Sequence, residues 1–229
     1  MTFLDVRTVA VTVLGHPLSW VELLGTLTYL WSVWLMARRH MLTWPVGILS
    51  VLLYMLLFWQ VRLYSDAVEQ VYYLGASLYG WRRWAAGLRE GRSAAAIRLS
   101  PPATLAFEVA LVAAGTLALG ALMSRSHELA PALFPEPASY PWVDAMTTVA
   151  SLLAMALLVL KRLESWVWWL GVDVVGIGLY WIKDIRFVAV LYVLLLGLAV
   201  KGLAEWRAEW AAGGGEAGLG PDPPDPQGR

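Results

Sequence analysis

Polar and aromatic residues recur at helical spacing inside apolar stretches of the sequence. One set stands four, three and four positions apart and therefore shares a helix face: Asp66, Gln70, Tyr73 and Ser77. A second face carries two indoles, a carboxylate and a phenol: Trp166, Trp169, Asp173 and Tyr180. A third face carries Asp144 and Thr148. Aromatic faces stack on flat rings and attract cations, and carboxylates accept hydrogen bonds from hydroxyl groups. The stripes predict a binding site for a flat ring, neutral or cationic, that carries hydroxyl groups.

The composition identifies a lipid bilayer as the surroundings of these stripes. The 229 residues are 59% hydrophobic and only 15% charged, whereas a soluble domain carries roughly a quarter charged residues. Seventeen Lys and Arg residues balance seventeen Asp and Glu residues, so net charge gives no indication of a nucleic-acid partner. There is no cysteine, which excludes disulfides and thiolate chemistry. The sequence predicts an integral membrane protein.

Charged residues divide the chain into seven apolar segments of the length that crosses a bilayer, about 20 residues each. The predicted membrane helices are residues 18–37, 41–61, 63–81, 103–123, 140–160, 163–182 and 187–204. Residues 1–17 lack the features of a signal peptide and are predicted to form an interfacial helix outside the membrane. Residues 207–229 are predicted to be a disordered cytoplasmic tail, because their later part is rich in Gly and Pro.

The distribution of basic residues predicts the orientation. Placing the N-terminus outside puts twelve Lys and Arg residues on the cytoplasmic side and five outside. Cytoplasmic loops carry an excess of these residues. We therefore expect an external N-terminus and a cytoplasmic C-terminus.

The chain also repeats itself at an offset of 122 positions. The matched pairs are Trp20 and Trp142, Glu22 and Asp144, Thr26 and Thr148, Trp44 and Trp166, Gly80 and Gly202, and Trp84 and Trp206. This pattern predicts two three-helix repeats, residues 18–84 and 140–206, joined by residues 85–139, which contain a linker helix at about 103–123. The linker helix makes the repeats parallel, in a 3+1+3 arrangement like that of SWEET transporters, with the site at their interface.

Asp173 is the deepest carboxylate, and no basic residue stands at its depth to pair with it. Because an ionisable group in a bilayer costs roughly 2.5–3.5 kcal/mol, we expect it to face the site. Four tryptophans near span ends, Trp20, Trp84, Trp142 and Trp206, are interpreted as an interfacial belt. The predicted substrate-binding residues are Trp166, Trp169, Asp173, Gln70, Asp66, Tyr73, Ser77, Asp144, Thr148, Tyr180 and Trp44. No motif for a catalytic site, metal or cofactor is recognised.

Several stretches resemble the PnuC-type vitamin transporters, best known for nicotinamide riboside. These are SWVELLGT at residues 19–26, LYSDAVEQVYYLGASLYGWRRW at 63–84, YPWVDAMTTVASLLAM from 140, and ESWVWWLGVDVVGIGLYWIKD from 164. The resemblance implies a SWEET-like fold, a homotrimer in the bacterial inner membrane, and facilitated diffusion of an unphosphorylated vitamin without a cofactor. The indoles at 166 and 169 would stack the ring, Gln70 would bind its polar edge, and Asp173 with Asp66 or Asp144 would hold hydroxyl groups or positive charge.

Some residues depart from the family pattern and keep other functions open. The family often has asparagine where this chain has Thr43, Ser50 and Ser165, and an apolar residue where it has Glu69. Thiamine or another B vitamin is therefore an alternative substrate. Proton coupling through Asp66, Asp144 or Asp173 is a second transport hypothesis. A scaffold subunit without transport activity, or a membrane-embedded enzyme, would be a different class of function.

Overall fold

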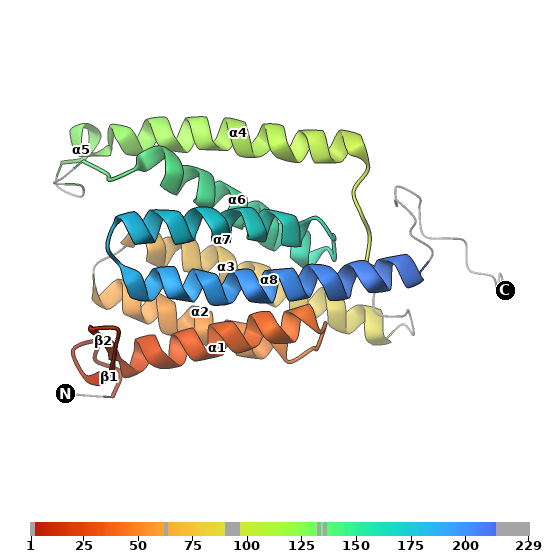
Figure 1. The fold of residues 1–229 in the computed structure, drawn as a ribbon, viewed down its shortest axis with the longest axis horizontal. Coiled ribbons are helices and arrows are strands. Elements are labelled where there is room, and N and C mark those ends of the chain that lie inside the picture. The colour runs from red at the N-terminus through yellow and green to blue at the C-terminus, as the bar shows by residue number, and fades with distance from the viewer. Residues whose placement is uncertain (1–2, 62–63, 90–96, 132–133, 135–136, 214–229) are drawn as a thin grey trace.

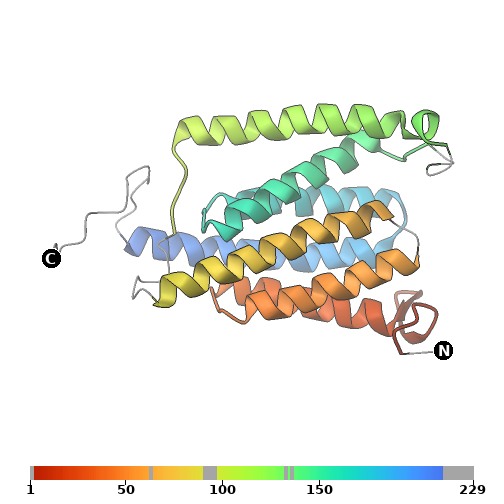
Figure 2. The ribbon, with the colours of Figure 1, turned by 180° about the vertical axis from the view of Figure 1, so that it is seen from behind.

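The computed structural model describes residues 3–61, 64–89, 97–131, 134 and 137–213. Within these residues an antiparallel pair of short strands precedes a bundle of helices (Figures 1 and 2). The elements are β1 (Val9–Val13), β2 (His16–Ser19), α1 (Trp20–Ala37), α2 (Thr43–Gln60), α3 (Tyr64–Arg89), α4 (Pro102–Ser124), the short α5 (Ser126–Leu129), α6 (Pro141–Val159), α7 (Ser165–Ile182) and α8 (Arg186–Ala212). Each of the seven predicted membrane segments coincides with one long helix.

Five of these helices are long and apolar enough, by length and composition, to cross a membrane. They are α2, α4, α6, α7 and α8. The two other long helices are α1 and α3; α3 carries acidic residues near its start and arginines near its end. The chain is therefore a mostly helical membrane protein.

The N-terminal segment is a β-hairpin, so the predicted interfacial helix is wrong. Leu14 and Gly15 both have positive φ, +51° and +81°, as a two-residue turn that matches strand twist requires. Before this turn valine stands at every second position, and β-branched side chains such as valine favour strands. The Gln60 side chain ties the segment before the hairpin to the end of α2: its Oε1 accepts from Val6 N at 3.0 Å, and its Nε2 donates to Leu4 O at 2.8 Å.

The C-terminal helix is longer than predicted. α8 continues through Arg207 to Ala212, so the predicted disorder is wrong for these residues. Trp206 and Trp210 pack against the buried core, and Glu209 forms an ion pair with Arg39, which together hold the last turns in place. Residues 214–229 of the predicted tail lie outside the described residues.

The two predicted repeats are two packed sets of three helices. α2 packs between α1 and α3, and α7 packs between α6 and α8. The sets meet along two seams, one where α1 contacts α8 and one where α3 contacts α6. Figure 2 shows α3 crossing beside α6, and α4 lying on the outer side of α6.

Two turns show the repeat in atomic detail. Arg39 after α1 and Lys161 after α6 both have φ of +56°, the left-handed conformation that ends many helices. In each turn the next amide reaches back five residues: His40 N donates to Leu35 O and Arg162 N to Leu157 O, both at 2.9 Å. These turns lie at the end of the bundle opposite the hairpin (Figure 1).

Candidate functional site

Acidic and tyrosine side chains from both repeats gather between the two helix sets. We call them the central polar cluster: Tyr29, Tyr54, Asp66, Glu69, Tyr73, Asp144, Asp173, Tyr180 and Tyr192. Tyr29 on α1 lies within electrostatic range of Glu69 on α3 and Asp173 on α7. The cluster therefore brings the predicted carboxylates of both repeats into one neighbourhood.

Asp173 is the most deeply buried carboxylate of this cluster. Its side chain is 3% exposed, and among the described residues no hydrogen bond or ion pair reaches it. A buried, unpaired carboxylate is costly, and such groups in membrane proteins usually bind a substrate or ion. Trp169, one turn earlier on α7, is partly buried and packs against both hydrophobic clusters of the core. Asp173 and Trp169 thus point to the interior, as the sequence predicts.

On α3 the side chain of Glu69 contacts the predicted polar stripe, although Glu69 is not one of the stripe residues. The Tyr73 hydroxyl donates to Glu69 Oε1 at 3.2 Å and lies within hydrogen-bonding reach of Ser151 on α6. Ser77 is buried one turn further along, and Gln70 is half-buried. Glu69 therefore belongs to the site although a four-three-four spacing does not select it.

A cation borders the cluster at the hairpin end of the bundle. Lys183 Nζ lies 3.5 Å from Asp144 Oδ1 and 5.8 Å from the centre of the Tyr180 ring. Asp144 is also within electrostatic range of Asp66 on α3. Lys183 balances part of this acidic charge, so a cationic ligand would compete with it. Thr148, one turn after Asp144 on α6, is half-buried.

Aromatic stacking fixes the tyrosines of the second repeat. Tyr180 and Tyr192 stack with ring centres 5.4 Å apart and planes inclined by 19°. Tyr192 lies so close to Gly176 that a Cβ there would be 2.5 Å from the ring. The predicted substrate-binding residues do not include Tyr192, Tyr29 or Tyr54. For Tyr192 a signal existed, because it stands 122 positions after Gln70, a predicted site residue.

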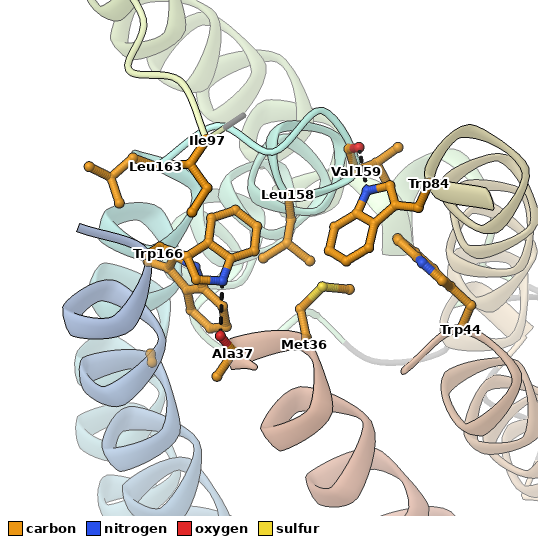
Figure 3. Close-up of a cluster of buried hydrophobic side chains, with 11 residues drawn as sticks. Met36, Ala37, Trp44, Trp84, Ile97, Leu158, Val159, Leu163 and Trp166 are labelled. Atoms are coloured by element: carbon orange, nitrogen blue, oxygen red, sulfur yellow. Dashed lines mark hydrogen bonds between the residues drawn. The ribbon is translucent and has the colours of Figure 1, made fainter. Parts of the chain in front are cut away.

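Four tryptophans at the other end of the bundle form a separate group, which we call the tryptophan clasp: Trp44, Trp84, Trp166 and Trp206. Trp84 Nε1 donates to Val159 O at the end of α6, and Trp206 Nε1 donates to Ala37 O at the end of α1, both at 3.1 Å (Figure 3). Each bond joins one repeat to the other. The interpretation of Trp84 and Trp206 as belt residues is therefore wrong, whereas Trp20 and Trp142 are exposed.

Two glycines make room for the clasp. A Cβ at Gly80 would lie 2.2 Å from the Trp44 ring, and a Cβ at Gly202 would lie 2.6 Å from the Trp166 ring. Trp44 and Trp166 are each 1% exposed, so neighbouring side chains enclose both rings. Substrate contact by these two indoles stays a prediction. Among the described residues no group of three His, Cys, Asp or Glu could hold a metal ion.

Comparison with known proteins decides the family. A model of the family described as "Nicotinamide mononucleotide transporter" matches residues 19–208, which include both repeats and the linker helix. The chain belongs to this family. Membership makes it a transporter rather than an enzyme, and the PnuC-type resemblance of the sequence is thereby confirmed.

Relatives within the family bear names that refer to different vitamins. The chain is 26% identical over 207 residues to the nicotinamide riboside transporter PnuC of Escherichia coli K12, covering 84% of this chain and 87% of that protein. It is 28% identical over 198 residues to the riboflavin/roseoflavin transporter RibM of Streptomyces davaonensis, covering 86% and 89%. A crystal structure of the vitamin B3 transporter PnuC matches with a TM-score of 0.59 at 18% identity, covering 85% and 83%. This match shows that the fold is shared.

Proposed function

We propose that this protein carries a vitamin built on a flat ring across the membrane by facilitated diffusion, with nicotinamide riboside as the first candidate. The observation that supports this most is the position of Asp173, an unpaired carboxylate between two repeats and among tyrosines. A pyridinium ring with an attached ribose presents a positive charge and several hydroxyl groups. A carboxylate attracts the charge and accepts hydrogen bonds from the hydroxyl groups.

The proposal assigns roles to the predicted site residues. Trp169 and Trp166 stack the ring, and Gln70 binds its polar edge. Asp173, with Asp66 or Asp144, holds hydroxyl groups or positive charge. The other predicted residues, Tyr73, Ser77, Thr148, Tyr180 and Trp44, complete the binding surface. We add Glu69 and Tyr192 to the proposed binding residues, because they lie within electrostatic range of each other in the central polar cluster.

We further propose that all seven long helices cross the plasma membrane of a bacterium. In this arrangement the hairpin lies outside, the tryptophan clasp lies at the cytoplasmic end, and the two three-helix repeats run parallel. Three copies of the chain assemble as a homotrimer, with a substrate path in each. Matching turns at Arg39 and Lys161 support the parallel repeat, because they place equivalent residues at the same end of the bundle.

The substrate alternatives follow from charge. Thiamine, which is cationic, suits the same acids, and riboflavin, which is neutral, is suggested by the name of one relative. Asp66 adds acidic charge beside Asp144, and Glu69 adds acidic charge beside Asp66, which favours a cationic ring over a neutral one.

Uptake into proteoliposomes tests the proposal. The purified protein is reconstituted, and entry of radiolabelled nicotinamide riboside is measured with excess unlabelled thiamine or riboflavin as competitor. We expect saturable uptake, competed by the vitamin that the site prefers. If none of the three vitamins enters or competes, the vitamin proposal fails, and a scaffold subunit becomes the better hypothesis. The same vesicles separate the two modes of transport: facilitated diffusion predicts uptake that is insensitive to an imposed pH gradient and to a protonophore.

A further inference from the structure

An apolar groove of about 440 Å³ opens along the seam between α3 and α6. It is lined by Val71, Tyr72, Gly75, Ala76 and Tyr79 from α3, by Ala156 and Val159 from α6, and by Leu160, which directly follows α6. Small side chains form its floor: a Cβ added at Gly75 would have no atom within 4 Å. The lined stretch of α3 spans about 12 Å at 1.5 Å per residue, most of the apolar half-thickness of a bilayer, about 15 Å.

The groove ends beside a basic hollow. A second depression of about 580 Å³ is lined by Trp81, Arg82, Ala85, Ala86 and Arg89. Residues 72, 75, 79, 82, 86 and 89 follow spacings of three and four, so the groove and the arginines share one face of α3. Among the described residues, Arg82 and Arg89 have no acidic partner. Trp81 is exposed beside them, as indoles at a membrane interface are.

The corresponding positions of the other seam carry different residues. At the offset of 122, Ala76 corresponds to Leu198 and Ala156 to Trp34, whose side chains are larger. The Arg38 guanidinium covers the Trp34 ring at 4.0 Å. The counterparts of Arg82 and Arg89 are Ala204 and Ala211. On the α3–α6 seam the groove therefore lies beside two arginines that have no acidic partner among the described residues, and the equivalent positions of α8 carry alanines instead.

We propose that this seam binds an anionic glycerophospholipid of the surrounding bilayer. One acyl chain lies in the groove over Gly75, and the phosphate lies between Arg82 and Arg89. Arginine forks match phosphate oxygens in geometry as well as charge. The apolar lining excludes a polar ligand from the groove, and the two free arginines select an anionic headgroup over a zwitterionic one.

Lipid binding by the purified full-length protein tests the headgroup contact. Native mass spectrometry in detergent compares phosphatidylglycerol with phosphatidylcholine of identical acyl chains. We expect the wild-type protein to prefer phosphatidylglycerol, and Arg82→Gln or Arg89→Gln to reduce that preference about fivefold each. The matched control is Arg207→Gln, an exposed arginine at the same end of α8, which should change nothing. Equal binding of both lipids by the wild-type protein, or an equal loss in the control, overturns the proposal.

The groove is tested by filling it. Gly75→Phe places a ring in open space over the groove floor, and Gly197→Phe is its counterpart on α8, where a Cβ also has no atom within 4 Å. We expect Gly75→Phe to lower the bound fraction of phosphatidylglycerol severalfold and Gly197→Phe to leave it unchanged. Unaltered binding in Gly75→Phe contradicts the acyl-chain contact. If Gly75→Phe instead dissociates an oligomer, the seam is an interface between copies and the lipid proposal is wrong.

Discussion

The tryptophan clasp and the central polar cluster are built from the same two repeats but differ in symmetry. In the clasp the Trp84 bond to Val159 O has its counterpart in the Trp206 bond to Ala37 O, with donors and acceptors each 122 positions apart. In the cluster two of the acids have apolar counterparts: Asp173 corresponds to Val51, and Glu69 to Leu191. Two equal halves can pack around a twofold axis, but a small asymmetric ligand needs different groups on its two sides. The repeat is thus retained where the halves contact each other and altered where a substrate would lie.

The largest expected effect tests the symmetry of the clasp. Trp84→Ala and Trp206→Ala each remove a buried indole and a hydrogen bond between repeats, so each should lower the free energy of unfolding by about 3–5 kcal/mol. Unfolding in detergent, followed by circular dichroism, measures both. Trp31→Ala removes an exposed indole and should cost much less. A large loss of unfolding free energy in only one of the two variants would show that the two hydrogen-bonded indoles do not contribute equally to stability.

The next effect tests the asymmetry of the cluster. Asp173→Asn should weaken substrate binding about 10- to 150-fold, because a hydrogen bond to a charged group contributes about 1.5–3 kcal/mol. The free energy of unfolding should stay constant or rise, since the substitution removes an unpaired buried charge. Binding is measured by isothermal titration calorimetry. Asp184→Asn, at an exposed carboxylate in the connection between α7 and α8, serves as control, and unchanged affinity in Asp173→Asn would place the site elsewhere.

A pH effect distinguishes the two equivalent turns. Burial lowers the pKa of the Lys161 ammonium from its ordinary 10.5 to about 8, whereas its counterpart Arg39 forms an ion pair with Glu209. Between pH 8 and 10.5 the unfolded chain holds a proton that the folded protein releases, so the free energy of unfolding should rise across this window. We expect a rise on the order of 1–2 kcal/mol after allowance for solvent screening.

Thermal unfolding in detergent between pH 7.5 and 10 measures this rise. In Lys161→Met the free energy of unfolding should no longer rise with pH. The control is Lys201→Met, which removes a lysine paired with Glu205 on α8, and it should keep the rise. A rise of equal size in Lys161→Met would assign it to another group.

The smallest effect concerns the charge of the substrate. Glu69→Gln keeps the hydrogen bond from Tyr73 but removes a negative charge. The second repeat has no such charge at the equivalent position, which is Leu191. Affinity for a cationic vitamin should fall about fivefold, corresponding to about 1 kcal/mol, while affinity for a neutral one stays unchanged. Competition of nicotinamide riboside against riboflavin measures the ratio. Equal losses for both vitamins would mean that Glu69 acts through structure rather than charge.

The sequence predicted where the long helices lie because each contains a long apolar block, and bilayer thickness fixes the length of such a block. It did not predict how far α3 and α8 continue beyond that block, because their last turns carry charged residues. It predicted that Asp173 and Trp169 face the interior because a helix repeats every 3.6 residues. It could not assign Trp84 and Trp206 to the clasp, because an indole near a span end suits either a lipid interface or a buried contact. The sequence features that point to the buried contact are Gly80 and Gly202. These glycines make room for the rings of Trp44 and Trp166, which pack with Trp84 and Trp206.

The hairpin and the tyrosines were missed for other physical reasons. The hairpin depends on a two-residue turn at Leu14 and Gly15, and Leu is an uncommon residue for positive φ. Tyr29 and Tyr54 stand on different helices, so their meeting is a result of helix packing. Lys183 follows a span end, where a basic residue is ordinary. Its position between Asp144 and the Tyr180 ring depends on how α6 and α7 pack.

Lys161 was counted among the basic residues that predict the orientation, yet in the folded protein it is 2% exposed and its ammonium faces the Trp84 ring at 4.2 Å. A charge so enclosed has no contact with lipid headgroups. For the orientation proposed here, any influence of Lys161 on topology is exerted while the nascent chain enters the bilayer, before the second repeat closes over it. Lys161 then has two roles in succession: it contributes to the orientation of the chain during membrane insertion, and it packs inside the folded protein afterwards.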